Sequence, residues 1–144
     1  MGRILIASLL LLAATTTFAA TNIRAVAPER LGSYWRMTNT EIDADVPNIG
    51  RNMDKPGCAA VSYTVGADGK TRDIVVRRVV PNGDLGKVAA SAVADLHYAP
   101  ANGNDAREPA YTYIIMPFNL PPDPAVRERV TAACKLTGFP QGYP

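Results

Sequence analysis

Residues 57–70 read GCAAVSYTVGADGK, and this stretch decides the fold. Apolar side chains recur at every second position through Val61, Tyr63 and Val65, which is the period of a β-strand with one face turned toward a core. The Asp68-Gly69 pair that follows is typical of a tight hairpin, because glycine accepts a positive φ. The stretch therefore predicts a strand that turns directly into a second, antiparallel strand.

The second strand is predicted over residues 71–80, with Ile74, Val76 and Val80 on its inner face. Residues 81–83, Pro-Asn-Gly, end it because proline cannot continue a central ladder. Asp84 is predicted to cap a helix through its side-chain oxygen. Apolar residues at spacings of three and four extend this helix from Leu85 to about Leu96.

A third strand is predicted over residues 109–120. Pro117 lacks an N–H group, so the C-terminal end of this strand should lie at a sheet edge. A final short helix is predicted from Ala125 to Thr137, with Asp123 as its cap and Gly138 at its end. Alternation divides the strand into one face with Thr112, Ile114, Met116, Phe118 and Leu120, and an opposite face, expected to be partly open, with Tyr111, Tyr113 and Ile115.

The order strand, strand, helix, strand predicts an α+β fold with two layers: an antiparallel β-β-α-β sheet under one covering helix, plus the short C-terminal helix. We divide the chain into a leader at 1–20, an N-terminal arm at 21–56, a central domain at 57–120 and a C-terminal helix and tail at 121–144. The arm has weak signals, and we expect it to pack through Trp35 and to form a short helix.

The leader has the three parts of a secretory signal peptide. Arg3 gives a charged start, an apolar run extends from Ile4 to Ala14, and small residues follow up to Ala20. The run is too short for a bilayer span, which needs about 20 apolar residues. We predict cleavage after Ala19 or Ala20 and export from the cytoplasm. A cut after Ala27 and an uncleaved inner-membrane anchor are the alternatives.

Charge and motif content narrow the class of function. Fifteen basic residues face thirteen acidic ones, for a net charge of +2, which gives no electrostatic case for nucleic acid as a partner. His97 is the single histidine, and no nucleophile, phosphate loop or cluster of metal ligands accompanies it. We therefore expect no enzyme activity, no metal and no cofactor. Tyr111 and Tyr113 fit a binding surface or simple strand propensity equally well.

The sequence contains two cysteines, Cys58 and Cys134. An even count in an exported chain favours a disulfide between them. The alternative is two separate buried thiols, because the sequence does not show whether their geometry allows a bond.

Residues 57–120 resemble the C-terminal domain of TonB-family proteins. The resemblance begins with the alternating run 57–65 and the turn 67–70, and continues through Ile74-x-Val76 and the alanine-rich helix at 89–93. It ends with Tyr98-x-Pro100-Ala101 and the strand Ile114-x-Met116-x-Phe118-x-Leu120. The order and spacing of these pieces carry the resemblance, since no single piece is specific.

The resemblance implies a periplasmic protein-binding module that recognises an extended peptide of an outer-membrane transport protein or another envelope protein. In this family the third strand offers its edge to the peptide, which is β-augmentation. Family members that transduce energy carry a membrane helix and a long proline-rich spacer. In this sequence the leader is short and only residues 21–56 separate it from the domain, so we expect the chain to act as a stand-alone module. The alternative is a structural envelope protein that self-associates, as a homodimer, through the same edge. The implied peptide-binding residues are Tyr111, Thr112, Tyr113, Ile114, Ile115, Met116 and Phe118.

Overall fold

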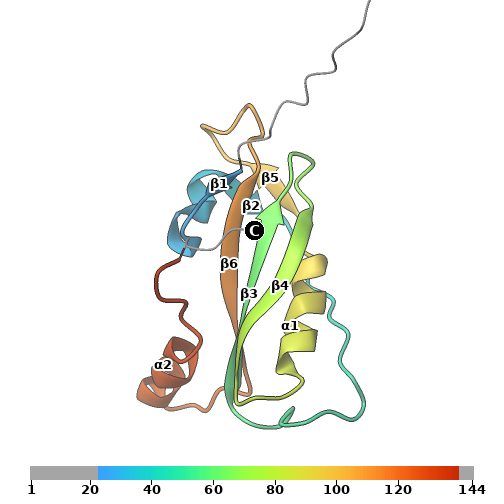
Figure 1. The fold of residues 1–144 in the computed structure, drawn as a ribbon, viewed down its shortest axis with the longest axis vertical. Helices are drawn as coiled ribbons and strands as arrows, with labels where there is room; N and C mark the ends of the chain where they lie inside the picture. Colours follow the sequence, from blue (N-terminus) through green and yellow to red (C-terminus); the bar gives the residue numbers. More distant parts are fainter. Residues whose placement is uncertain (1–22, 140–144) are drawn as a thin grey trace, which may run out of the picture.

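The computed structural model describes residues 23–139, so the predicted leader and the last five residues lie outside the described part. The chain forms an α+β fold with a curled four-stranded sheet, a second small sheet and short helices (Figure 1). Within the described residues, no helix is long and apolar enough to cross a membrane. In chain order the elements are β1 (Arg24–Ala25), η1 (Pro28–Ser33), β2 (Trp35–Met37), β3 (Gly57–Val65), β4 (Thr71–Val80), α1 (Leu85–Ala94), β5 (Tyr98–Pro100), β6 (Ala110–Phe118) and α2 (Pro124–Ala132).

The main sheet has the order β1-β6-β3-β4, with β3 antiparallel to both β4 and β6 and the two-residue β1 parallel to β6. The strand–strand–helix–strand order predicted from the sequence is therefore confirmed. The hairpin turn is also confirmed: Gly69 has a φ of +78°. A Cβ atom at Gly69 would lie only 2.0 Å from the carbonyl oxygen of Tyr98, so both conformation and space require glycine there.

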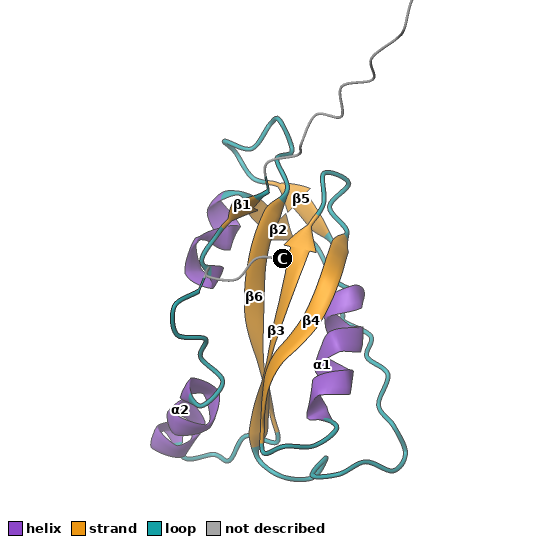
Figure 2. Ribbon diagram, in the orientation of Figure 1, coloured by secondary structure: helices purple, strands orange, loops and turns teal. Residues whose placement is uncertain are grey.

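One face of the sheet packs on α1, as Figure 2 shows. Alternate residues of β3 and one stripe of α1 are fully buried in this layer, and Trp35 of the arm, 1% exposed, joins the same core as predicted. Gly86 lets the helix approach closely, because a Cβ atom there would lie 2.7 Å from Cγ2 of Val79. The predicted short helix of the arm is the 3-10 helix η1.

Strand β4 contains two β-bulges, which change the set of its side chains that face the core from the predicted one. The register shifts between Ala60 and Val61 and again between Ser62 and Thr64 of the partner strand, so β4 contains extra residues. Each extra residue reverses the alternation, and Val79 packs in the core while Val80 pairs opposite Cys58 on the other face. The predicted inner position of Val80 was wrong for this reason.

The predicted cap of α1 was also wrong. The side chain of Asp84 accepts no hydrogen bond from a backbone N–H of the first turn. Its carboxylate accepts a hydrogen bond from the backbone N–H of Arg51 at 2.8 Å and lies 2.9 Å from Nζ of Lys87, so it fastens the loop of the arm instead. Asp123 does cap α2, where its Oδ1 accepts from the N–H groups of Ala125 and Val126.

The second face of the sheet, expected to be partly open, is covered by α2 and the residues after it. Cys58 and Cys134 form a disulfide, as predicted, and both are fully buried. The ring of Phe139 lies 5.4 Å from that of Tyr111 and 4.8 Å from that of Tyr113, measured between centroids. Both tyrosines are therefore buried, although α2 itself has no buried residue.

We expect removal of this disulfide to loosen α2 while β3 and α1 stay packed. The bond closes a separation of 76 residues, so the Cys58→Ala, Cys134→Ala double variant should lose about 4.5 kcal/mol of unfolding free energy in the chain-entropy model. Urea denaturation measures the loss, and hydrogen exchange should show faster exchange in α2. The reduced parent protein is the control and should behave like the variant. Unchanged protection of α2 would contradict the expectation.

A pair of buried tyrosines makes the fold sensitive to alkali. The hydroxyl groups of Tyr63 and Tyr98 lie 2.6 Å apart. Burial raises the pKa of Tyr63 far above its usual range, and the neighbouring Tyr98 raises it further; burial also raises the pKa of Tyr98. Both groups stay neutral in the folded protein while the unfolded chain ionises near pH 10. The unfolding free energy should therefore fall as pH rises above about 10.

The Tyr63→Phe variant should show a shallower fall, because it removes the group with the largest shift. Equilibrium denaturation at several pH values between 8 and about 11.5 would measure both slopes. Equal slopes for variant and parent would show that Tyr63 does not carry the effect.

Candidate functional site: the outer edge of the third long strand

Strand β6 has two edges that are used very differently. Its inner edge pairs with β3 along the whole strand, from Ala110 opposite Val65 to Phe118 opposite Gly57. Its outer edge pairs only with β1, whose register stops at Tyr111. Within residues 23–139, no other strand is hydrogen bonded to that outer edge. The predicted edge position of the C-terminal part of this strand is confirmed.

Two hydrogen bonds fix which backbone groups point outward. The N–H of Arg24 donates to the carbonyl of Pro109 at 3.4 Å, and that of Val26 donates to the carbonyl of Tyr111 at 2.8 Å. The N–H and C=O groups of one strand residue point to the same side, and successive residues alternate. The backbone groups of Tyr113 and Ile115 therefore point outward, beyond the end of β1.

The residues that the family resemblance implied as peptide-binding fall into two groups, according to the direction of their backbone N–H and C=O groups. Thr112, Ile114 and Met116 turn their backbone groups toward β3, as does Phe118, so they support the edge rather than offer hydrogen bonds. The outward groups of Tyr111 are engaged by β1. Tyr113, which is 7% exposed, and Ile115, which is half-buried, have outward groups that no strand pairs within residues 23–139. The same holds for the carbonyl of Pro117, whose nitrogen carries no hydrogen.

The open part of the edge is flanked by hollows. One of about 440 Å³ lies between the end of β6 and α2, and its lining includes Ile115 and Leu120, Arg127 of α2, and Lys135 just after that helix. A second of about 250 Å³ is lined by Tyr113, Lys135 and Phe139 among others. Tyr113 also lines a third hollow, described below. Lys135 lines both the first and the second hollow, and Tyr113 lines both the second and the third.

The third hollow, of about 400 Å³, lies where the arm meets β6. We call it the arm hollow. Aromatic and apolar side chains dominate its lining, and Arg36 is its charged member. It is lined by Pro28, Leu31, Gly32, Trp35, Arg36, Met37, Tyr63, Tyr98, Tyr113 and Ile114.

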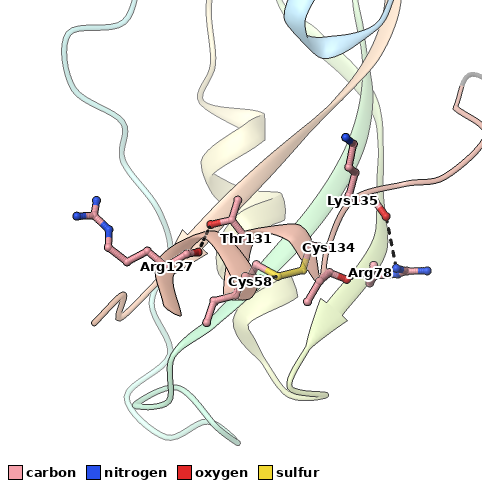
Figure 3. Close-up of a disulfide and its surroundings, with 8 residues drawn as sticks. Cys58, Arg78, Arg127, Thr131, Cys134 and Lys135 are labelled. Carbon is pink, nitrogen blue, oxygen red and sulfur yellow. Dashed lines mark hydrogen bonds between the residues drawn. A yellow bond between two sulfur atoms is a disulfide. The ribbon is translucent and has the colours of Figure 1, made fainter. Parts of the chain in front are cut away.

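The wall formed by α2 is fastened at its C-terminal end. Figure 3 shows the bridge from Cys58 on β3 to Cys134, just after α2, with Arg78 beside it. Nη1 of Arg78 donates to the carbonyls of Ala133 at 3.2 Å and Lys135 at 3.4 Å. The disulfide and this arginine together hold the helix end, and with it Lys135, next to the sheet.

Arg77 stabilises the same face from β4. Its Nε donates to the hydroxyl of Ser62 at 2.7 Å, and its Nη2 donates to the hydroxyl of Tyr111 at 3.1 Å. This arginine spans three strands, because Ser62 lies on β3 and Tyr111 on β6. Its two hydrogen bonds link β4 to β3 and β6.

Sequence reasoning found the strand but missed the walls. Lys135, Leu120 and the arm residues Arg36 and Met37 were not among the predicted binding residues. For Lys135, Arg36 and Met37 a local sequence signal does not exist, because the arm and the C-terminal segment reach β6 only through long-range contacts. Leu120 was predicted as the last residue of the strand but not as a binding residue. Within the described residues, no cluster of three histidine, cysteine or acidic side chains is arranged to hold a metal ion.

Comparison with known proteins finds a structural likeness but no sequence match. No family model matches the chain, and no curated protein matches it. The solution NMR structure of the Pseudomonas aeruginosa TonB C-terminal domain is similar to this chain with a TM-score of 0.45 and 17% sequence identity. The similarity covers 63% of this chain and 91% of that one.

Thr112 offers a test of how the edge strand is anchored. Its hydroxyl oxygen is buried and has no hydrogen-bond partner among the described residues. Replacing it by valine keeps the shape and removes the unsatisfied group, so Thr112→Val should raise the unfolding free energy by about 1 kcal/mol. Urea denaturation measures this change. Ser62→Ala is the control and should destabilise, since the Ser62 hydroxyl accepts from Arg77. Destabilisation by Thr112→Val would show that its hydroxyl has a partner in solution.

Proposed function

We propose that this protein is a periplasmic protein-binding module of the TonB C-terminal type. It recognises an extended peptide of an outer-membrane transport protein by β-augmentation at the outer edge of β6. The observation that carries the proposal is the pair Tyr113 and Ile115, whose backbone groups point outward where β1 has ended. An edge of this kind pairs with an incoming strand because both partners then satisfy their N–H and C=O groups.

The opposite edge of the sheet supports the choice of β6. Strand β4 is also unpaired on its outer side among the described residues, but it carries two bulges and the charged residues Arg72 and Arg78. Bulges and edge charges are the devices by which proteins discourage strand addition. Between Tyr113 and Ile115, by contrast, β6 has an even register and carries no charge.

Two further features support the location of the protein. The predicted signal peptide directs the chain out of the cytoplasm. The Cys58–Cys134 disulfide is of the kind that persists in an oxidising compartment such as the periplasm. The sequence resemblance of residues 57–120 to TonB C-terminal domains then supplies the partner class.

Backbone methylation of the partner tests the pairing directly. The isotope-labelled protein would be titrated with synthetic peptides from the periplasmic N-terminal segments of outer-membrane receptors, first unmodified and then methylated at one amide nitrogen at a time. We expect the amide signals of Tyr113 and Ile115 to shift, while those of β4 stay in place. Methylation at alternate peptide positions should abolish binding, because only every second N–H faces β6.

Binding that is equally sensitive or insensitive at every methylated position would contradict strand addition. Sedimentation of the protein alone tests the self-associating alternative. A dimer that dissociates in the Ile115→Pro variant but not in the Ile115→Thr variant would show that a second copy occupies the edge, since only proline removes the outward N–H.

A further inference from the structure

The aromatic side chains that line the arm hollow are held by hydrogen bonds within the protein. Trp35 is 1% exposed, and its Nε1 donates to the carbonyl of Glu108 at 3.0 Å, so its ring is fixed in one orientation. The rings of Tyr63 and Tyr98 are stacked with centroids 6.3 Å apart, and their hydroxyl groups hydrogen bond to each other. The polar atoms of these three rings are therefore satisfied within the protein. The rings line the hollow while almost fully buried, with Tyr63 1% and Tyr98 7% exposed.

The rim of the hollow adds a cation and a thioether. Met37 is 41% exposed, and Arg36 beside it is exposed and forms no ion pair within residues 23–139. A guanidinium group is attracted to the negative face of an aromatic ring, and a thioether sulfur makes favourable contacts with ring edges. None of the lining residues is acidic. A guanidinium and a thioether at the rim of an apolar lining can therefore hold an aromatic ring.

The arm hollow and the hollow next to α2 lie on opposite faces of the sheet. The hollow contains Ile114, which faces the α1 side, whereas the hollow next to α2 contains Ile115, which faces the other side. The side chains of a strand added to β6 alternate between these faces. Every second side chain of the added strand would therefore point toward the arm hollow, and the side chains between them would point toward α2.

We propose that the arm hollow is a specificity subsite that receives an aromatic side chain of the extended partner. The inference rests on the proposed function, since strand pairing at β6 brings the side chain to the hollow. The arm thereby has a role in recognition: β2 and η1 convert a bare strand edge, which pairs with any sequence, into a site that selects one class of residue. Backbone pairing gives affinity, and the pocket gives specificity.

The experiment uses three synthetic nine-residue peptides of alternating threonine and valine with a central phenylalanine, leucine or alanine. The protein is expressed from the full-length chain, and binding is followed by calorimetry and by NMR. The phenylalanine peptide should bind about ten- to a hundredfold tighter than the alanine peptide, because a whole aromatic side chain leaves water. It should bind about two- to tenfold tighter than the leucine peptide. It should also shift the signals of the Met37 methyl and the Trp35 indole, which the alanine peptide should leave in place.

Two variants separate the subsite from general effects. Met37→Ala should reduce the preference for phenylalanine over alanine without changing the affinity for the alanine peptide. Val75→Ala is the matched control, because Val75 has a similar exposure of 40% but lies on β4. It should leave both affinities unchanged.

The outcomes distinguish the two proposals. Failure of all three peptides and of every receptor peptide to bind would overturn the proposed function and the subsite together. Peptides that shift the amides of Tyr113 and Ile115 but bind equally well with phenylalanine and alanine would overturn the subsite alone. Equal affinity for phenylalanine and leucine would overturn the aromatic class of the occupant.

Discussion

The structure depends on the burial of β3 on both faces. Every residue of this strand, from Gly57 to Val65, is buried, and it lies between β4 and β6 in the sheet. A strand in this position needs two covers, because its side chains alternate between the faces. Its inner residues meet α1, and its outer residues meet the C-terminal segment. Everything else in the fold is arranged around supplying those two covers.

The two covers are held by different forces. Helix α1 packs through an apolar stripe that includes Leu85, Ala89 and Val93, all essentially unexposed. Helix α2 has no buried side chain, and a covalent bond from Cys58 to Cys134 fixes its end instead. One layer is thus stabilised by the hydrophobic effect, and the other by a crosslink together with a small apolar cluster that includes Leu136 and Phe139. The open edge of β6 lies along the second, more loosely packed layer.

Local sequence signals predicted the elements but not their long-range partners. Alternation over 57–65 and the Asp68-Gly69 turn were sufficient for the hairpin, and the apolar stripe after Asp84 was sufficient for α1. The bulges in β4 were not predictable, because valines and arginines occupy both faces there and Asp73, which has a φ of +52°, carries no turn signal of its own. The sequence also did not predict which residues of β6 turn their N–H and C=O groups outward beyond β1. This depends on where the short strand β1 pairs with β6, about 85 residues away in sequence.

The part of the outer edge of β6 that can pair with another strand is limited by Pro117 at one end and by β1 at the other. Strand β1 occupies the edge up to Tyr111, and after Ile115 the next outward-facing nitrogen belongs to a proline. Between these two stops the strand rises by about 20 Å. A footprint of this length engages only a handful of residues of any visiting chain. A contact surface so small is typical of weak, transient complexes rather than of permanent assemblies.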